Sequence, residues 1–387
     1  MTKETKTLSI IVIAQFCCTS LWFAGNGVMT DLIMEFQLMS EAIGHLTSAV
    51  QFGFILGTLT FAILTIADRF SPSKVFFISA VLGASINLFT LFPQNNLITL
   101  LIIRLGTGFF LAGIYPIGMK IAADYFKEGL GKSLGYLVGA LVLGTALPHL
   151  LKAFSINYDW RLVIFLTSAL AFFGGIIVFF FVPNGPFRKP AASFKLRGFY
   201  QVFTNRKFRS AAFGYFGHMW ELYAFWAFVP FIVTKFLNQD YIYDSLIAFI
   251  IIAVGGPACV LGGYLSQKFG PARTASAALL CSGLCCLLSP LAFYFFSYEA
   301  MIIFLLIWGI TVIADSPLFS TLVANNAEPQ IKGTALTIVN CLGFSITIVS
   351  IQILNSAQAW IPAHLLFLLL LPGPIAGLIA IKPYRVN

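Results

Sequence analysis

The amino-acid sequence predicts an all-α membrane protein with twelve transmembrane helices, arranged as two pseudo-symmetric six-helix bundles. Of its 387 residues, 59% are hydrophobic and only 10% are charged, whereas soluble proteins carry about 25% charged residues. Uncharged runs of about 20 residues, the length that crosses a bilayer as a helix, recur along the chain. A basic stretch in the middle separates these runs into two sets of six.

The first predicted helix begins like a secretory signal peptide, because Lys3 and Lys6 precede its apolar run. That run of about twenty residues is too long for the hydrophobic region of such a peptide, so we expect an uncleaved helix. Continuous apolar runs also argue against membrane β-strands, in which apolar and polar residues alternate. The first six helices are expected at residues 8–28, 43–66, 75–92, 97–118, 132–151 and 160–182.

The basic stretch between Pro183 and Ser210 contains seven Lys or Arg residues and no acidic residue. Such a segment is typical of a cytoplasmic loop that lies against anionic lipid headgroups. We therefore expect two domains, residues 1–187 and 210–387, joined by a cytoplasmic linker at 188–209. The second set of helices is expected at residues 210–236, 246–266, 274–295, 299–322, 333–355 and 361–381.

The distribution of basic residues predicts the orientation, because cytoplasmic loops are enriched in Lys and Arg. With the N-terminus in the cytoplasm, only Lys152, Arg161 and Lys235 fall on the outer side of the membrane, and Arg104 falls within a helix. The other basic residues fall on the cytoplasmic side. We therefore expect a multi-pass protein of the cell inner (plasma) membrane with both termini in the cytoplasm. The net charge of +9 follows from this topology and requires no nucleic-acid partner.

The sequence contains no pattern that predicts a metal site or a cofactor. All seven cysteines fall in predicted spans, where packing as small apolar side chains is their expected role. The tripeptide Gly131-Lys132-Ser133 resembles the end of a phosphate-binding loop, but Phe126 occupies the position of that loop's first glycine. We therefore expect neither a nucleotide site nor a catalytic centre.

Two segments recur at nearly the same spacing, which indicates an internal duplication. Residues 68–74 (DRFSPSK) follow the second predicted helix and resemble residues 267–273 (QKFGPAR), which follow the eighth, 199 positions later. Residues 131–134 (GKSL) open the fifth helix as residues 333–336 (GTAL) open the eleventh. Parallel six-helix repeats of this kind are characteristic of one transporter fold.

With these features the chain resembles a member of the major facilitator superfamily over its full length. That family's loop after helix two reads Gly-x-Leu-Ala-Asp-Arg-x-Gly-Arg-Arg/Lys, and residues 67–69 (ADR) and Lys74 match it. Leu64 and Ser71 replace its glycines, while the second copy keeps both glycines and has Gln267 for the aspartate. The fourth-helix motif Arg-x-x-x-Gly and the glycine-rich, proline-ended fifth helix are matched by Arg104 with Gly108, and by Gly135, Gly139, Gly144 and Pro148.

The resemblance implies a conformational latch in the loops after helices two and eight. It implies that the carboxylate of Asp68 pairs across the two halves and favours the outward-open state. The alternative is an ordinary solvated loop charge. The latch candidates are Asp68, Arg69, Lys74, Gln267 and Lys268.

Arg104 is a candidate functional residue because a charge at mid-bilayer costs from about 3 to over 10 kcal/mol. It could bind an anionic substrate or stabilise a deprotonated coupling carboxylate. It could instead bond the carbonyls of helix one, or Gln15 and Asn26. The resemblance ties this arginine to proton coupling.

Helix seven and helix ten supply the other ionisable candidates. His218 and Glu221 are three residues apart, so their side chains share one helical face and could take up and release a proton. Asp315 precedes Ser316-Pro317 at a predicted break in helix ten. Pro116 lies at the equivalent depth in helix four. Each ionisable candidate could be a protonation site, and the alternatives are a structural buried pair for His218 and Glu221 and a helix-break cap for Asp315.

Aromatic residues near mid-span could line a central cavity, where a polar group beside an apolar ring helps to hold organic solutes. Most aromatic residues in so phenylalanine-rich a chain are expected to face lipid or neighbouring helices instead. Together with Arg104, the cavity candidates are Trp22, Asn26, Tyr115, Trp220, Tyr223 and Trp226.

These observations predict a secondary active transporter in which two rigid bundles rock about a midplane site, with protons as the coupling ion. We expect a monomer whose partners are a small-molecule substrate, protons and the lipid bilayer. A deep arginine and aromatic walls suit an organic or inorganic anion. The alternative is efflux or uptake of an amphipathic drug or a siderophore-like metabolite, and the remote alternatives are an integral membrane enzyme and a channel.

Overall fold

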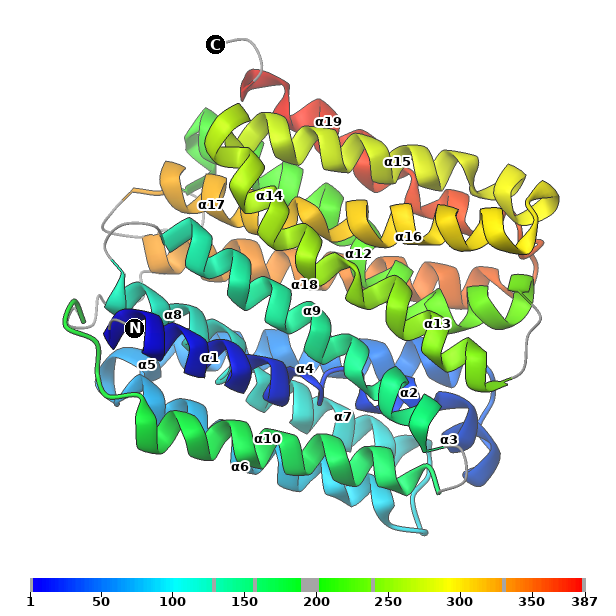
Figure 1. Ribbon diagram of the computed structural model, residues 1–387, viewed down its shortest axis with the longest axis horizontal. Helices are drawn as coiled ribbons and strands as arrows, with labels where there is room; N and C mark the ends of the chain where they lie inside the picture. Colours follow the sequence, from blue (N-terminus) through cyan, green and yellow to red (C-terminus); the bar gives the residue numbers. More distant parts are fainter. Residues whose placement is uncertain are drawn as a thin grey trace. The chain divides into compact units, whose positions relative to one another are not determined.

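A computed structural model describes residues 3–126, 130–155, 159–188, 202–237, 241–328 and 332–384, and these residues contain helices but no strand. The chain forms two compact units, Met1–Phe194 and Lys195–Asn387. The boundary falls within the predicted linker 188–209, most of which lies outside the described residues. Each unit is described by itself (Figure 1).

The first unit is a bundle in which α4 packs along α7, and α10 packs along both α6 and α1. Figure 1 shows its helices in blue to green. Its elements are α1 (Lys3–Thr19), α2 (Ala24–Gly27), α3 (Met29–Glu35), α4 (Ala42–Ile63), α5 (Ile66–Arg69), α6 (Pro72–Leu88), η1 (Phe89–Leu91), α7 (Leu97–Leu111), α8 (Tyr115–Tyr125), α9 (Leu130–Phe154) and α10 (Arg161–Phe181).

The second unit is a bundle in which α12 packs against α18 and α19, and α16 packs against α14 and α15. Its elements are η2 (Val202–Thr204), α12 (Arg206–Leu237), α13 (Tyr241–Ala253), α14 (Gly255–Phe269), α15 (Pro271–Phe295), α16 (Tyr298–Ala314), α17 (Ser316–Asn326), α18 (Lys332–Ala357), η3 (Leu366–Leu370), α19 (Pro372–Ile381) and η4 (Lys382–Tyr384).

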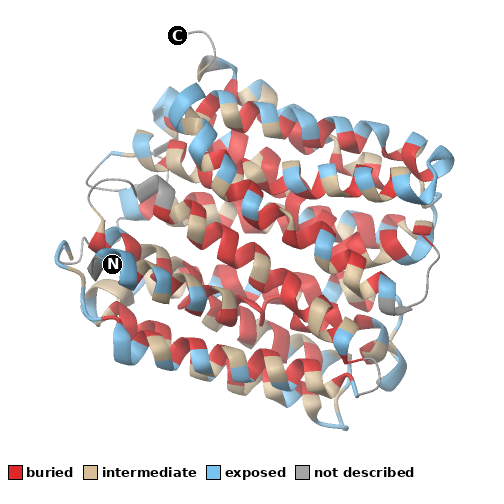
Figure 2. Cartoon of the chain, viewed as in Figure 1, coloured by how far each residue is buried: buried red, intermediate tan, exposed pale blue. Residues whose placement is uncertain are grey.

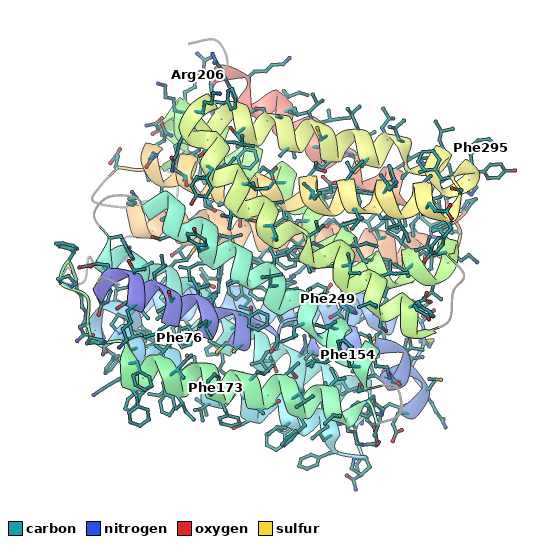
Figure 3. The ribbon with its side chains drawn as sticks, in the orientation of Figure 1. Phe76, Phe154, Phe173, Arg206, Phe249 and Phe295 are labelled. Atoms are coloured by element: carbon teal, nitrogen blue, oxygen red, sulfur yellow. The ribbon has the colours of Figure 1, made fainter. Side chains whose placement is uncertain are left out.

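The predicted all-α membrane fold class is confirmed. Within the described residues, ten helices are long and apolar enough to cross a membrane. Their outward faces remain apolar, as at Phe173 on α10, which is 52% exposed, whereas Phe76 on α6 is buried (Figures 2 and 3). Lipid rather than water can solvate such a surface.

The first and last predicted helices are shorter and more broken than expected. The prediction of one helix over 8–28 is corrected, because α1 ends at Thr19 and α2 and α3 follow separately. Gly25 and Gly27 lie within α2 and have low helix propensity, and Gly27 allows close packing, since a Cβ there would lie 2.7 Å from Cβ of Pro148. The predicted helix at 361–381 begins instead as the 3₁₀ helix η3 and continues as α19.

Two spans are interrupted at prolines in corresponding places. α7 and α8 are separated just before Pro116, and α16 and α17 just before Pro317. Proline has no N–H to continue the helical ladder, so it ends one helix and starts the next. The expected break beside Asp315 is therefore present.

Equivalent glycine contacts occur within each of the two units and support the internal duplication. A Cβ on Gly108 would lie 2.0 Å from the carbonyl oxygen of Val50, and one on Gly309 would lie 2.1 Å from that of Ile251. Gly309 lies 201 positions after Gly108, and Ile251 lies 201 positions after Val50. At the slightly different spacing of 199 positions, Gly144, which abuts Phe16, corresponds to Gly343, which abuts Tyr215.

Alanine at Gly108 or Gly309 is expected to destabilise the folded protein. The added methyl group would overlap a carbonyl of the neighbouring helix, and overpacking of this kind costs about 1–3 kcal/mol or more. Gly263→Ala is the matched control, because nothing lies within 4 Å of a Cβ there. Melting temperatures of detergent-purified variants should separate the two groups, and equal values for Gly108→Ala and Gly263→Ala would contradict the packing.

Ion pairs hold α3 against the ends of α9 and α10. Nζ of Lys152 lies 2.8 Å from Oδ1 of Asp31, and Nη2 of Arg161 lies 2.6 Å from Oε1 of Glu35. Arg161 also acts on its neighbour Asp159. Burial raises the pKa of Asp159, but the backbone N–H and guanidinium of Arg161 together bring that pKa below the ordinary aspartate value. Because its folded-state pKa is lowered, Asp159 stabilises the fold above the ordinary aspartate range, and this contribution is lost as pH falls through the lowered pKa.

Lys152→Met is expected to destabilise the protein by about 1.5–3 kcal/mol, the usual contribution of a hydrogen bond to a charged group. The double charge exchange Asp31→Lys with Lys152→Asp should recover part of this loss in a thermal unfolding assay. Lys235→Met removes an exposed charge and serves as the control. A melting temperature for Lys152→Met equal to that of the control would show that the pair does not stabilise α3.

Candidate functional site

Glu221 lies at the centre of the second unit, fully enclosed by α12, α15 and α16. Its side chain is 1% exposed. Nε1 of Trp308 donates to Oε1 at 2.6 Å, Oγ of Ser282 donates to Oε2 at 2.9 Å, and Sγ of Cys286 contacts Oε1 at 3.3 Å. Three donors from two other helices thus converge on one carboxylate, the pattern that satisfies a buried acidic group.

Aromatic rings surround this carboxylate on the side of Trp308. The Trp308 ring stacks on Phe225, with centroids 4.6 Å apart, and contacts Phe304 and Phe367 edge-on at 5.7 and 6.2 Å. A charge in such an apolar shell is poorly solvated unless its donors compensate for the lost water. The loss or gain of one proton at Glu221 therefore changes how strongly α12 is bonded to α15 and α16.

His218 and Asp315 form a second buried pair in the same unit. Nδ1 of His218 lies 2.8 Å from Oδ1 of Asp315, and both side chains are 1% exposed. The two atoms are close, but neither oxygen of Asp315 receives a donor with hydrogen-bond geometry among the described residues. We therefore treat this as a close contact between ionisable groups rather than as an aligned hydrogen bond.

Asp315 occupies the junction between α16 and α17. Its backbone carbonyl accepts from the N–H groups of Leu318 and Phe319 at 3.0 and 2.9 Å, while its side chain makes no capping bond. The carboxylate is therefore directed to His218 and is not used to end the helix. Of the two predicted roles, the structure gives Asp315 the geometry of a paired ionisable group.

His218 and Glu221 have different partners, although they lie one turn apart on α12. The sequence predicts that they form one pair, but His218 contacts Asp315 whereas Glu221 bonds Trp308, Ser282 and Cys286. Together they bring two carboxylates and one imidazole into a single buried region. Such a region can hold a variable number of protons.

Arg104 is the corresponding buried charge of the first unit. It is 3% exposed. Nη1 donates to the carbonyl of Leu21 at 3.1 Å, and Nη2 makes a short hydrogen bond to the carbonyl of Trp22. Both carbonyls lie in the break after α1, and no described carboxylate forms an ion pair with the guanidinium.

Trp22 lies in the same break and Asn26 lies in the following helix α2, and both side chains bond to α4. Nε1 of Trp22 donates to Oε1 of Gln51 at 3.3 Å, and Nδ2 of Asn26 donates to Oγ1 of Thr47 at 2.8 Å. The structure thus brings Arg104, Trp22 and Asn26 together around one segment. Tyr115 is buried at the start of α8.

The aromatic candidates of α12 do not share one direction. Nε1 of Trp220 donates to the carbonyl of Leu369 in η3 at 3.0 Å. The ring of Tyr223 contacts Trp226 on the same helix, with centroids 5.4 Å apart, and Phe344 on α18, with centroids 5.2 Å apart. Within the second unit, Trp220 therefore faces η3, whereas Tyr223 faces α18.

A model of the Major Facilitator Superfamily matches residues 11–351. The chain belongs to this superfamily. It is therefore a membrane transporter by family, and the alternative of an integral membrane enzyme is set aside. The resemblance based on the loop and helix motifs is confirmed.

One curated relative of this superfamily member is distant in sequence. This chain is 23% identical over 279 residues to an uncharacterized transporter of Schizosaccharomyces pombe, covering 63% of the chain and 54% of that protein. The chain thus spans about half the length of this curated relative.

Solved structures share the fold. The human organic anion transporter MFSD10 (TETRAN) matches with a TM-score of 0.77 and 14% identity, covering 99% of this chain and 100% of that one. A bacterial homologue of the human lysosomal transporter Spinster, inward-facing and unoccupied, matches with a TM-score of 0.72 and 16% identity over 98% and 94% of the two chains.

The latch motif of this superfamily member makes contacts within the first unit. Oδ1 of Asp68 lies 2.9 Å from Nζ of Lys120, which also lies 3.5 Å from Asp124. Arg69 and Lys74 are exposed, as are Gln267 and Lys268 in the second copy. Pairing of Asp68 across the two halves stays a prediction.

Sequence reasoning missed several residues that complete these sites. Ser282 and Cys286 were recognisable only as small residues in apolar runs, and their bonds to Glu221 depend on how the helices pack. Lys120 lies among the basic residues expected on the cytoplasmic side, and the structure makes it the ion-pair partner of Asp68. Its spacing of four from Asp124 was the one signal available.

Proposed function

We propose that this transporter carries a small organic anion by proton-coupled alternating access, in the cell inner membrane with both termini in the cytoplasm. One observation supports the proposal above all: each unit buries ionisable groups of opposite kind. The first unit holds Arg104, whose guanidinium donates to the neutral carbonyls of Leu21 and Trp22. The second holds two carboxylates and one imidazole.

The second unit is the proposed proton site. Glu221 accepts three hydrogen bonds and can be held as an anion by them, whereas contact with His218 gives Asp315 a partner that is itself titratable. A conformational change that alters access of water to this region changes the cost of carrying charge there. The proton content of the site then depends on which face of the transporter is open.

The first unit is the proposed anion site. Carbonyl oxygens satisfy donors of the Arg104 guanidinium but leave its positive charge uncompensated, so an anion in the vicinity is favoured. An arginine is also suited to carboxylates because its planar fork can make two parallel hydrogen bonds. The description of MFSD10 as an organic anion transporter supports the same substrate class.

Uptake by proteoliposomes with an imposed pH gradient tests the proposal. A panel of labelled mono- and dicarboxylates, a siderophore and a cationic dye should be offered to the purified transporter. We expect one of the carboxylates to accumulate only when the gradient is present, and to stop when a protonophore is added. Movement of the dye or the siderophore without any carboxylate would support the amphipathic-solute alternative instead.

A further inference from the structure

The segment after α10, residues 182–188, is hydrogen-bonded to the end of α8 and to residues 68–74. We call residues 182–188 the strap and residues 68–74 the latch loop. Oγ of Ser73 donates to the carbonyl of Val182 at 2.6 Å, and the hydroxyl of Tyr125 donates to the carbonyl of Pro183 at 2.8 Å. Oγ of Ser71 lies 2.8 Å from Oδ1 of Asn184. These bonds fix the first half of the strap on α6 and α8.

The second half of the strap lies directly on the backbone of α8 and of the latch loop. The N–H of Phe187 donates to the carbonyl of Asp124 at 3.0 Å. A Cβ on Gly185 would lie 2.4 Å from that same carbonyl oxygen, so the two backbones are in close contact and only glycine is accommodated without movement. The strap is thus packed as well as hydrogen-bonded.

Arg188 ends the strap and holds the latch loop by its backbone. Nη2 of Arg188 donates to the carbonyls of Asp68 and Phe70, both at 2.8 Å. Because Arg188 uses carbonyls, the carboxylate of Asp68 is left for Lys120. One guanidinium therefore fixes the position of the loop without competing for the charge that the loop presents.

We propose that Arg188 is a positioning residue of the latch, and that the strap is the connection through which the linker between the two units holds the latch loop in place. Arg188 is the last described residue before residues 189–201, through which the chain continues to the second unit. A pull on the linker acts first on Arg188 and then on the backbone of Asp68–Phe70. The proposal depends on neither the substrate nor the coupling ion.

The test measures release of the strap from the latch loop, residues 68–74. A cysteine is placed at Val182, whose side chain is 2% exposed and whose carbonyl, which accepts from Ser73, is unaffected by the substitution. Its rate of reaction with a water-soluble maleimide is measured on the full-length protein in detergent, with the parent lacking this cysteine as background. In Arg188→Met we expect the rate to rise at least about tenfold, because both charge-assisted hydrogen bonds to the loop are lost.

Three further variants make the result decisive. Arg188→Lys keeps a donor and should restore part of the protection, and Tyr125→Phe should raise the rate because it removes only the bond to Pro183. Arg206→Met makes the same charge change at an exposed residue at the start of α12 (Figure 3) and should leave the rate at the parental value. The proposal is overturned if Arg188→Met labels like the parent, if Arg206→Met labels as fast, or if labelling rises only together with a loss of the melting transition.

Discussion

Glu221→Gln is expected to abolish the response of transport to an imposed pH gradient while leaving exchange of the solute across the membrane intact. Glutamine keeps the size of the side chain and an oxygen that accepts from Trp308, but it cannot gain or lose a proton in the physiological range. For coupling of one proton per anion, a gradient of one pH unit supports about tenfold accumulation through its chemical part. That accumulation should disappear in the variant.

The measurement compares two assays on the same proteoliposomes: uptake driven by the gradient and exchange at equal pH. Ser282→Ala is the matched control, because it removes one donor to the same carboxylate and keeps the titratable group. Gradient-driven uptake should survive in the control. If Glu221→Gln still accumulates solute like the parent, Glu221 is a structural residue, and Asp315→Asn then tests the other buried pair.

Arg104→Met is expected to weaken binding of the anion at least tenfold and also to lower stability. Loss of a charge-assisted hydrogen bond costs about 1.5–3 kcal/mol, and each 1.4 kcal/mol is a factor of ten in affinity. The carbonyls of Leu21 and Trp22 lose their donors at the same time, which weakens the contact between α7 and the break after α1. Arg104→Lys should give an intermediate result because its ammonium group cannot span both carbonyls as a fork does.

Ligand-induced shifts of the melting temperature separate the two roles of Arg104. Gln51→Leu removes a bond to Trp22 from the same segment without changing its charge, so it reports the structural effect of loosening the break. The anion should stabilise Gln51→Leu as it stabilises the parent, but not Arg104→Met. Equal stabilisation of Arg104→Met by the anion would show that Arg104 only stabilises the packing of helix one and does not bind the substrate.

The sequence was sufficient for the membrane fold because apolar content and run length are dictated by the bilayer. It was also sufficient for the internal repeat, whose motifs recur at nearly the same spacing as the matching glycine contacts at Gly108 and Gly309. It was not sufficient for the break after Thr19, because residues 20–23 contain neither glycine nor proline. Close approach of Pro148 to Gly27, at the end of α2, likewise belongs to the tertiary structure.

The ionisable candidates could be found from the sequence, but their partners could not. Spacing of three residues correctly put His218 and Glu221 one turn apart, yet the helices packed around α12 decide what each contacts. The donors to Glu221 come from positions 61, 65 and 87 residues away in the chain. For Arg104, bonding to the carbonyls of helix one is among the roles predicted from the sequence, and the structure contains those bonds.

Movement of protons driven by the anion is the most direct test of the account. Proteoliposomes containing a pH-sensitive dye and no initial pH gradient receive the transported carboxylate on one side only, with the membrane potential clamped. We predict a change of internal pH that follows the anion gradient, reverses when that gradient is reversed, and is absent in Glu221→Gln. Transport of the anion with no accompanying change of internal pH would contradict proton coupling.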